Sequence, residues 1–78
     1  MLTKPTTLTR RDIQVALLIA QGKTDQEIGR ELLLGYETIR SYVKRLRGKL
    51  GLRRKAQIAV YVSQNRARLT AKLQKERP

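Results

Sequence analysis

Cationic side chains crowd the segment 35–50, GYETIRSYVKRLRGKL, at a spacing that suits one face of a helix. The cations predicted to share that face are Arg40, Lys44, Arg45 and Arg47. Arg and Lys bind anions such as carboxylates and phosphates, and also the acceptor edge of guanine. Apolar residues of the same segment recur at helical spacing and form one stripe for burial. The stripe consists of Ile39, Val43, Leu46 and Leu50. The pattern predicts a helix with one buried face and one anion-binding face, which could contact a membrane, an acidic partner or the major groove of DNA.

The composition favours a polyanion as the partner and argues against an enzyme. The 78 residues carry 18 Lys and Arg against 6 Asp and Glu, a formal net charge of +12. The chain has no Cys and no His, so we expect no catalytic residue, no metal and no cofactor. The longest apolar run, residues 15–20, is too short to cross a bilayer, which predicts a cytoplasmic protein with no membrane partner. Three Tyr without Trp or Phe are few for stacking on single-stranded bases, so double-stranded DNA is favoured over RNA.

Two further helices are predicted before the basic segment. Thr9 with Asp12, and Thr24 with Glu27, have the spacing of capping boxes, in which side chain and backbone satisfy each other at a helix start. Gly22 supplies a left-handed stop between them. The second of these helices is short and is joined to the basic segment by about three residues. A short capped helix followed, across a tight turn, by the basic and amphipathic helix of the segment 35–50 indicates a helix-turn-helix.

The C-terminal third of the chain predicts a fourth helix. Its apolar pattern runs to about Asn65, and Leu69 and Leu73 continue roughly in phase. The last residues could therefore be helical against a packing partner or form a frayed basic tail. The expected organisation is a flexible lead-in at 1–7, an all-α domain at 8–65 and a basic C-terminal extension at 66–78.

Six short motifs follow one another in a recognisable order. They are Leu8-Thr9-x-Arg11-Asp12, Leu18-Ile19-Ala20-x-Gly22-x-Thr24, Glu27-Ile28-Gly29, Leu32-x-Leu34, Thr38-Ile39-Arg40 and Lys49-Leu50-Gly51-Leu52. Together they resemble the signature of the LuxR/GerE-type helix-turn-helix DNA-binding domain, which also forms the output half of NarL-type response regulators. The resemblance covers residues 8–62 and implies a four-helix, all-α fold whose third helix enters the major groove and whose fourth commonly forms a dimer interface. Free-standing domains of this length occur in the family, as in GerE, and Met1 favours a natural short protein of that kind.

The resemblance and the side-chain chemistry together assign contacts to named residues. The positions that family members direct at base edges are Arg40, Ser41 and Lys44. Arg and Lys suit guanine, whose O6 and N7 are both acceptors, while solvation or phosphate contact is the alternative. Phosphate contacts are expected of Thr24, Tyr36, Thr38, Arg45, Arg47 and Lys49. Capping alone is the alternative for Thr24, and an exposed charge without a fixed contact is the alternative for Arg45 and Arg47. The dimer interface implied by the family is assigned to Tyr61, Val62 and Leu69.

Four positions depart from the family pattern. Gly35 stands where a serine usually caps the recognition helix, Tyr42 where a histidine is common, Gly29 where alanine is usual, and Lys55 where arginine is typical. The lost cap hydroxyl and the bulkier phenol change what two of these positions can donate. Packing or a phosphate contact are the two readings of Tyr42.

Two functions from different classes are compatible with these features. The first is a sequence-specific transcriptional regulator that reads the major groove with helix 36–50 and binds DNA as a homodimer on two half-sites about one helical turn apart. The second is a small interaction protein that pairs with a larger LuxR-type regulator, or contacts RNA polymerase, and modulates it. A basic face kept opposite the apolar stripe favours the first.

Overall fold

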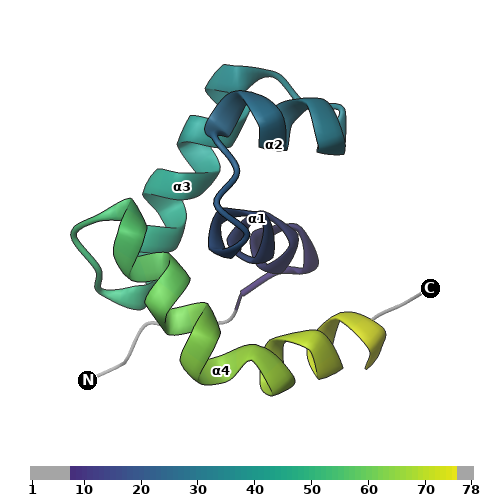
Figure 1. The fold of residues 1–78 in the computed structure, drawn as a ribbon, viewed down its shortest axis with the longest axis vertical. Coiled ribbons are helices and arrows are strands. Elements are labelled where there is room, and N and C mark those ends of the chain that lie inside the picture. Colours follow the sequence, from purple (N-terminus) through teal and green to yellow (C-terminus); the bar gives the residue numbers. More distant parts are fainter. Residues whose placement is uncertain (1–7, 76–78) are drawn as a thin grey trace, which may run out of the picture.

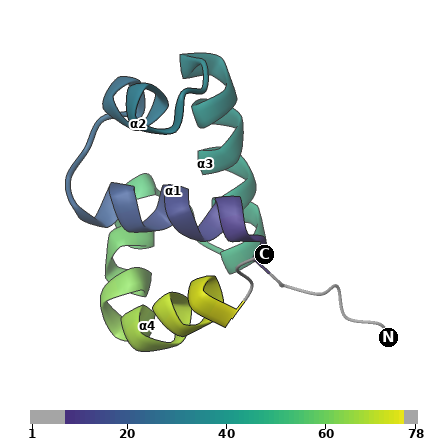
Figure 2. The same ribbon diagram turned by 90° about the vertical axis from the view of Figure 1, so that its right-hand side faces the viewer.

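The computed structural model describes residues 8–75, which form four α-helices (Figure 1). They are α1 (Arg10–Ala20), α2 (Asp25–Leu32), α3 (Tyr36–Leu50) and α4 (Lys55–Lys75). α1 packs against each of the other three helices, and most extensively against α4. It lies between α2 and the second half of α4, while α3 runs past its side (Figures 1 and 2). The predicted all-α, four-helix fold is confirmed, whereas the predicted lead-in at 1–7 lies outside the described residues.

Capping boxes begin α1 and α2, as predicted. The Thr9 hydroxyl accepts a hydrogen bond from the Asp12 amide at 3.1 Å, and the Asp12 carboxylate accepts one from the Thr9 amide at 2.9 Å. Thr24 and Glu27 repeat the arrangement at 3.1 and 2.8 Å. Each box satisfies backbone donors that a helix start leaves without intrahelical acceptors. The starts of both helices are therefore set by residues three positions apart.

The turn between α2 and α3 is tight and depends on one glycine. Leu33 ends α2 in the left-handed region, with φ of 58°, and the Leu34 amide donates to the Gly29 carbonyl at 2.8 Å. A Cβ at Gly29 would lie only 2.6 Å from the Leu34 carbonyl oxygen. Any side chain at this position would therefore meet the backbone of the turn. This close approach places the start of α3 against α2.

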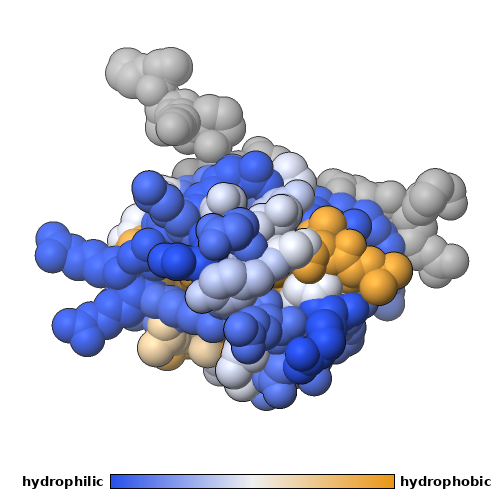
Figure 3. All heavy atoms as spheres, turned by 90° about the horizontal axis from the view of Figure 1, so that it is seen from above, coloured by the Kyte–Doolittle hydropathy of each residue, from blue (hydrophilic) through white to orange (hydrophobic). Residues whose placement is uncertain are grey.

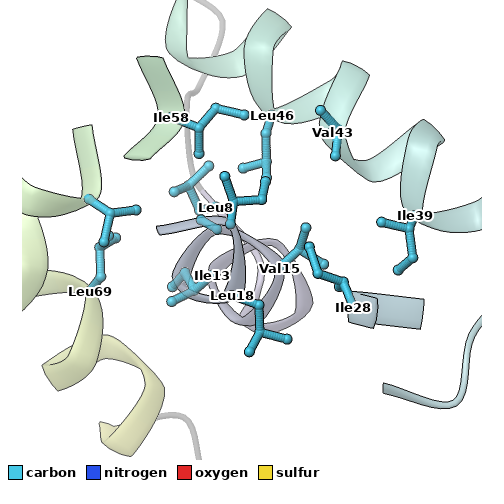
Figure 4. Packing of buried hydrophobic residues seen from close by; sticks show 13 residues of the cluster. Leu8, Ile13, Val15, Leu18, Ile28, Ile39, Val43, Leu46, Ile58 and Leu69 are labelled. Atoms are coloured by element: carbon cyan, nitrogen blue, oxygen red, sulfur yellow. The ribbon is translucent and has the colours of Figure 1, made fainter. Parts of the chain in front are cut away.

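The hydrophobic core surrounds α1 and takes side chains from all four helices (Figure 4). From the apolar stripe of α3, Ile39, Val43 and Leu46 are buried as predicted. Leu50 differs, because at the last residue of the helix it is only partly buried against the edge of the cluster. No helix within residues 8–75 is both long enough and apolar enough to span a membrane.

α4 continues beyond the predicted end of the fourth helix. It bends at Asn65, which has non-helical torsions (φ −129°, ψ 18°) and whose side-chain amide donates to the Tyr61 carbonyl at 2.9 Å. Beyond the bend, Leu69 is buried and the Arg10 guanidinium donates to the Leu73 carbonyl at 2.7 Å. Of the two alternatives for the start of the extension, the structure therefore shows a helix packed back on α1.

This packing corrects two of the three residues assigned to a dimer interface. Val62 is fully buried and Leu69 is 5% exposed, and both belong to the core cluster. Both side chains belong to the core, Val62 ahead of the bend at Asn65 and Leu69 beyond it, so they leave almost no surface for a second chain. Tyr61 is partly buried, whereas its neighbour Val60 is 55% exposed.

Candidate nucleic-acid interface

The outer face of α3 forms a wall of an open groove, here named the α3 groove, with a volume of about 480 Å³. Its lining consists of Asp25, Glu37, Arg40, Ser41, Val43, Lys44, Arg47 and Lys55. The three residues predicted to contact bases therefore lie together, exposed, on the side of α3 that faces away from the core. Figure 3 views the end of the molecule that carries α2 and the start of α3, where hydrophilic side chains cover most of the surface.

The first turn of α3 holds two features that suit an anion. Gly35 provides no side-chain cap, so the leading amides of the helix have no side-chain acceptor at this position. The Arg40 guanidinium lies 5.8 Å from the centroid of the Tyr36 ring, a cation–π distance that directs this side chain toward the helix start. A positive side chain and backbone amides without a side-chain cap thus occur at the start of α3.

A second hollow of about 410 Å³ adjoins the α3 groove and is lined by Thr24, Asp25, Gln26, Tyr36 and Lys55. It brings together two of the residues predicted to contact phosphate, Thr24 and Tyr36. The Thr24 hydroxyl oxygen accepts the capping hydrogen bond, which leaves its own proton available to another acceptor. Thr38 is exposed in the first turn of α3 but lines neither hollow.

An ion pair stands where the two hollows meet. The Lys55 ammonium lies 2.8 Å from the Asp25 carboxylate, and both residues line both hollows. The pair joins the start of α2 to the start of α4. Both side chains of the pair are only partly exposed.

Arg45 and Lys49 line neither hollow and instead bind a buried carboxylate. Asp12 is fully buried, with Arg45 Nη2 2.8 Å from Oδ1 and Lys49 Nζ 2.7 Å from Oδ2. Burial by itself raises the pKa of Asp12, but hydrogen bonds from Lys49, Arg45 and Thr9 outweigh it and lower the pKa to about 2. We call these three charged residues, Asp12, Arg45 and Lys49, the Asp12 cluster. It ties the start of α1 to the second half of α3.

Two further side chains are also engaged within the chain. The Arg45 guanidinium stacks on the Tyr42 ring at 4.6 Å from its centroid, which supports the packing reading of that tyrosine. Arg47 lines the α3 groove, yet its Nη1 donates to the Arg53 carbonyl at 2.9 Å and its Nε is buried without a partner. Phosphate binding by Arg45, Arg47 or Lys49 would therefore compete with contacts already made in the chain, and for these residues it stays a prediction.

The sequence of this chain matches a family of known proteins. Residues 6–62 match the family described as bacterial regulatory proteins, luxR family. The chain belongs to the luxR family. Because this is a family of regulatory proteins whose helix-turn-helix domain binds DNA, the chain is a DNA-binding domain of transcription regulators and not an enzyme.

Three relatives differ in the share of their length that this chain covers. It is 38% identical over 58 residues to the transcriptional regulatory protein LiaR of Bacillus subtilis, a match that covers 74% of this chain and 28% of LiaR. It is 33% identical over 57 residues to the DNA-binding transcriptional activator DevR/DosR of Mycobacterium tuberculosis, covering 73% of this chain and 26% of the relative. It is 36% identical over 53 residues to the spore germination protein GerE of Bacillus subtilis, covering 68% and 72%. The chain thus spans about a quarter of the first two relatives and most of the third.

Departures from the luxR-family pattern can now be placed in the structure. Gly35 leaves the start of α3 without a side-chain cap. Tyr42 supports Arg45 through its ring, and Lys55 pairs with Asp25 at the edge of the groove. The differences therefore cluster around α3 and its neighbours: Gly29 is buried at the turn, and the other three positions are exposed or partly buried.

Proposed function

We propose that this chain is a sequence-specific regulator that places α3 in the major groove of DNA and reads bases with Arg40, Ser41 and Lys44. The observation that carries the proposal is the α3 groove, in which these three residues lie exposed on the side of α3 opposite the core. A major groove about 12 Å wide admits a helix presented in this way. The net charge of +12 adds a sequence-independent attraction to phosphate.

Phosphate contacts are proposed at the rim of the same surface. Thr24 and Tyr36 line the second hollow, and Thr38 lies in the first turn of α3 beside the leading amides. Such contacts fix the register of a helix on DNA without reading sequence. The candidates that the Asp12 cluster already engages, Arg45 and Lys49, would have to share their protons between Asp12 and a phosphate.

Selection of bound sites from random duplexes tests the proposal directly. Arg40→Ala should relax the preference at one base position by about 1–3 kcal/mol, because a bidentate contact to guanine is lost. Arg66→Ala removes the same charge from an exposed position of α4 and serves as the control, which should leave the selected motif unchanged. A motif that Arg40→Ala leaves intact would show that Arg40 does not read a base.

We also propose that two copies bind together through the exposed side of α4, with Val60 and the edge of Tyr61 at the contact. The support is the exposed side chain of Val60 on a helix whose Ile58, Val62 and Leu69 are buried in the core. Val60→Glu should weaken binding to paired half-sites and leave binding to a single half-site unchanged, as measured by titration of the two duplexes. Equal weakening on both duplexes would contradict the α4 contact, and a complex with a larger regulator that no longer binds DNA would favour the interaction-protein alternative.

A further inference from the structure

Glu37 differs from every other acidic residue in the described part of the chain. Asp12 and Glu27 cap helices and accept hydrogen bonds from their caps, Asp25 pairs with Lys55 at 2.8 Å, and Glu31 lies 3.7 Å from Lys23. The Glu37 carboxylate is exposed, and between residues 8 and 75 it takes part in no side-chain hydrogen bond or ion pair. In a chain of net charge +12, this carboxylate is thus available to a partner.

The position of Glu37 places it among the residues proposed to read bases. It lies one turn before Arg40 and Ser41, at i and i+3 or i+4, and two turns before Lys44. All four residues line the α3 groove. A DNA surface that meets Arg40 from this side therefore also meets the Glu37 carboxylate.

The chemistry of a carboxylate restricts what it can bind in the major groove. An ionised carboxylate only accepts hydrogen bonds, so phosphate oxygens and the acceptor edge of guanine repel it. The amino donors in the major groove are N4 of cytosine and N6 of adenine. Adenine presents the acceptor N7 beside its amino group, whereas cytosine itself carries no major-groove acceptor beside its amino donor. Cytosine is the base that suits Glu37.

We infer that Glu37 is a specificity-determining residue that selects a cytosine in the target, next to the base read by Arg40. The inference rests on the proposed function, because it requires α3 in the major groove. In the first turn of α3, a negatively charged side chain would then select a base, as the positively charged Arg40 and Lys44 do further along the helix. Two side chains within two turns of α3 then define the target. Arg40 donates hydrogen bonds to one base, and Glu37 accepts a hydrogen bond from another.

A purely structural role predicts a different result. Glu37 occupies the first turn of α3, where a negative charge stabilises a helix through its dipole, and Gly35 supplies no competing cap. Under that role, removal of the carboxylate lowers the stability of the chain and leaves the selected sequence unchanged.

Site selection with two substitutions separates these roles. Glu37→Ala should reduce the preference for cytosine at one position about tenfold or more and leave the Arg40-dependent position intact. Glu37→Gln should shift the preference at that position toward adenine, because a glutamine amide both donates to N7 and accepts from N6. Titration of duplexes that differ only at this base pair measures both ratios.

The control variant is Glu31→Gln, which removes the same charge from an exposed acid of α2 outside the α3 groove. It should leave the motif as in the wild type. An unchanged motif in Glu37→Ala, with or without a lower melting temperature, would overturn the inference while the proposed function stands. A wild-type chain that selects no motif would overturn the proposed function, and this inference with it.

Discussion

The cations of α3 form two sets with different surroundings. Arg40 and Lys44, in the first part of the helix, are exposed in the α3 groove, and no carboxylate of residues 8–75 forms an ion pair with them. Arg45 and Lys49, on the neighbouring side, bind the buried carboxylate of Asp12. A basic helix therefore need not act as a single DNA-binding surface, because a cation that binds a buried carboxylate stabilises the fold. Substitutions in one set should change stability, and substitutions in the other should change DNA binding.

The largest expected effect comes from removing the centre of the Asp12 cluster. Asp12→Ala should lower the free energy of unfolding by about 3 kcal/mol, because it leaves two cations without their buried partner and removes the capping box of α1. The value lies at the low end for buried pairs because the Arg45 side chain is 48% exposed. Urea denaturation followed by circular dichroism measures the change.

The matched control is the exposed Lys23–Glu31 pair, where Glu31→Ala should cost less than about 1 kcal/mol. A loss from Asp12→Ala as small as that of the control would mean that the Asp12 cluster contributes little to stability.

The second prediction concerns pH. The pKa of Asp12 is lowered from 3.8 to about 2 in the folded chain, so between pH 4 and pH 2 the unfolded chain binds a proton that the folded chain does not. The stabilisation from Asp12, about 2 kcal/mol, is therefore complete above pH 4 and lost as the pH falls through 2. Asp12→Asn should lack this part of the acid dependence.

Denaturation of both chains from pH 7 to pH 2 provides the measurement, and the difference between them removes the contribution of other carboxylates. This subtraction matters because the hydrogen bond from the Thr24 amide also lowers the pKa of Glu27. Parallel curves for the wild type and Asp12→Asn would contradict the ionised Asp12 cluster.

The third prediction contrasts one lysine from each set. Lys44→Ala should reduce DNA affinity and lower the slope of log affinity against log salt by about one, because one cation is removed from the DNA surface. Lys49→Ala should instead lower the free energy of unfolding by about 1–2 kcal/mol, because Asp12 loses a partner in a partly buried pair. Titration at several salt concentrations, with denaturation of each variant, separates the two. An equal fall in slope for Lys49→Ala would support the phosphate contact proposed for it.

Much of the fold could be predicted because its signals are local. Thr9 and Thr24 start helices through partners three residues away, and the turn at Gly29 follows from the missing side chain. The grouping of Arg40 with Lys44 follows from the helical repeat alone. Base reading by these residues depends on how α3 lies against DNA, and helical periodicity does not determine that position.

The parts that could not be predicted depend on contacts far apart in the chain. Asp12 was fully explained as a capping residue, yet its strongest partners lie 33 and 37 positions away. The signal that could have found it is a pair of cations four residues apart on α3, on the side nearest the α1 start. Leu69 was assigned to a dimer interface from the family resemblance, and the bend at Asn65, which turns it onto α1, leaves no periodic signal that could have corrected the assignment.

The smallest expected effect tests whether the second half of α3 can be changed without changing DNA binding. Gly48 lies inside the helix with open space where a Cβ would be, so Gly48→Ala should raise the free energy of unfolding by about 0.5–1 kcal/mol. Gly51→Ala is the matched control and should lower it by about 1 kcal/mol, because φ at this helix end is +70°. If Gly48→Ala stabilises the chain while the selected motif and the salt slope stay constant, the second half of α3 supports the fold and the first half contacts DNA. A change in the motif would place Gly48, and with it the second half of the helix, in the DNA interface.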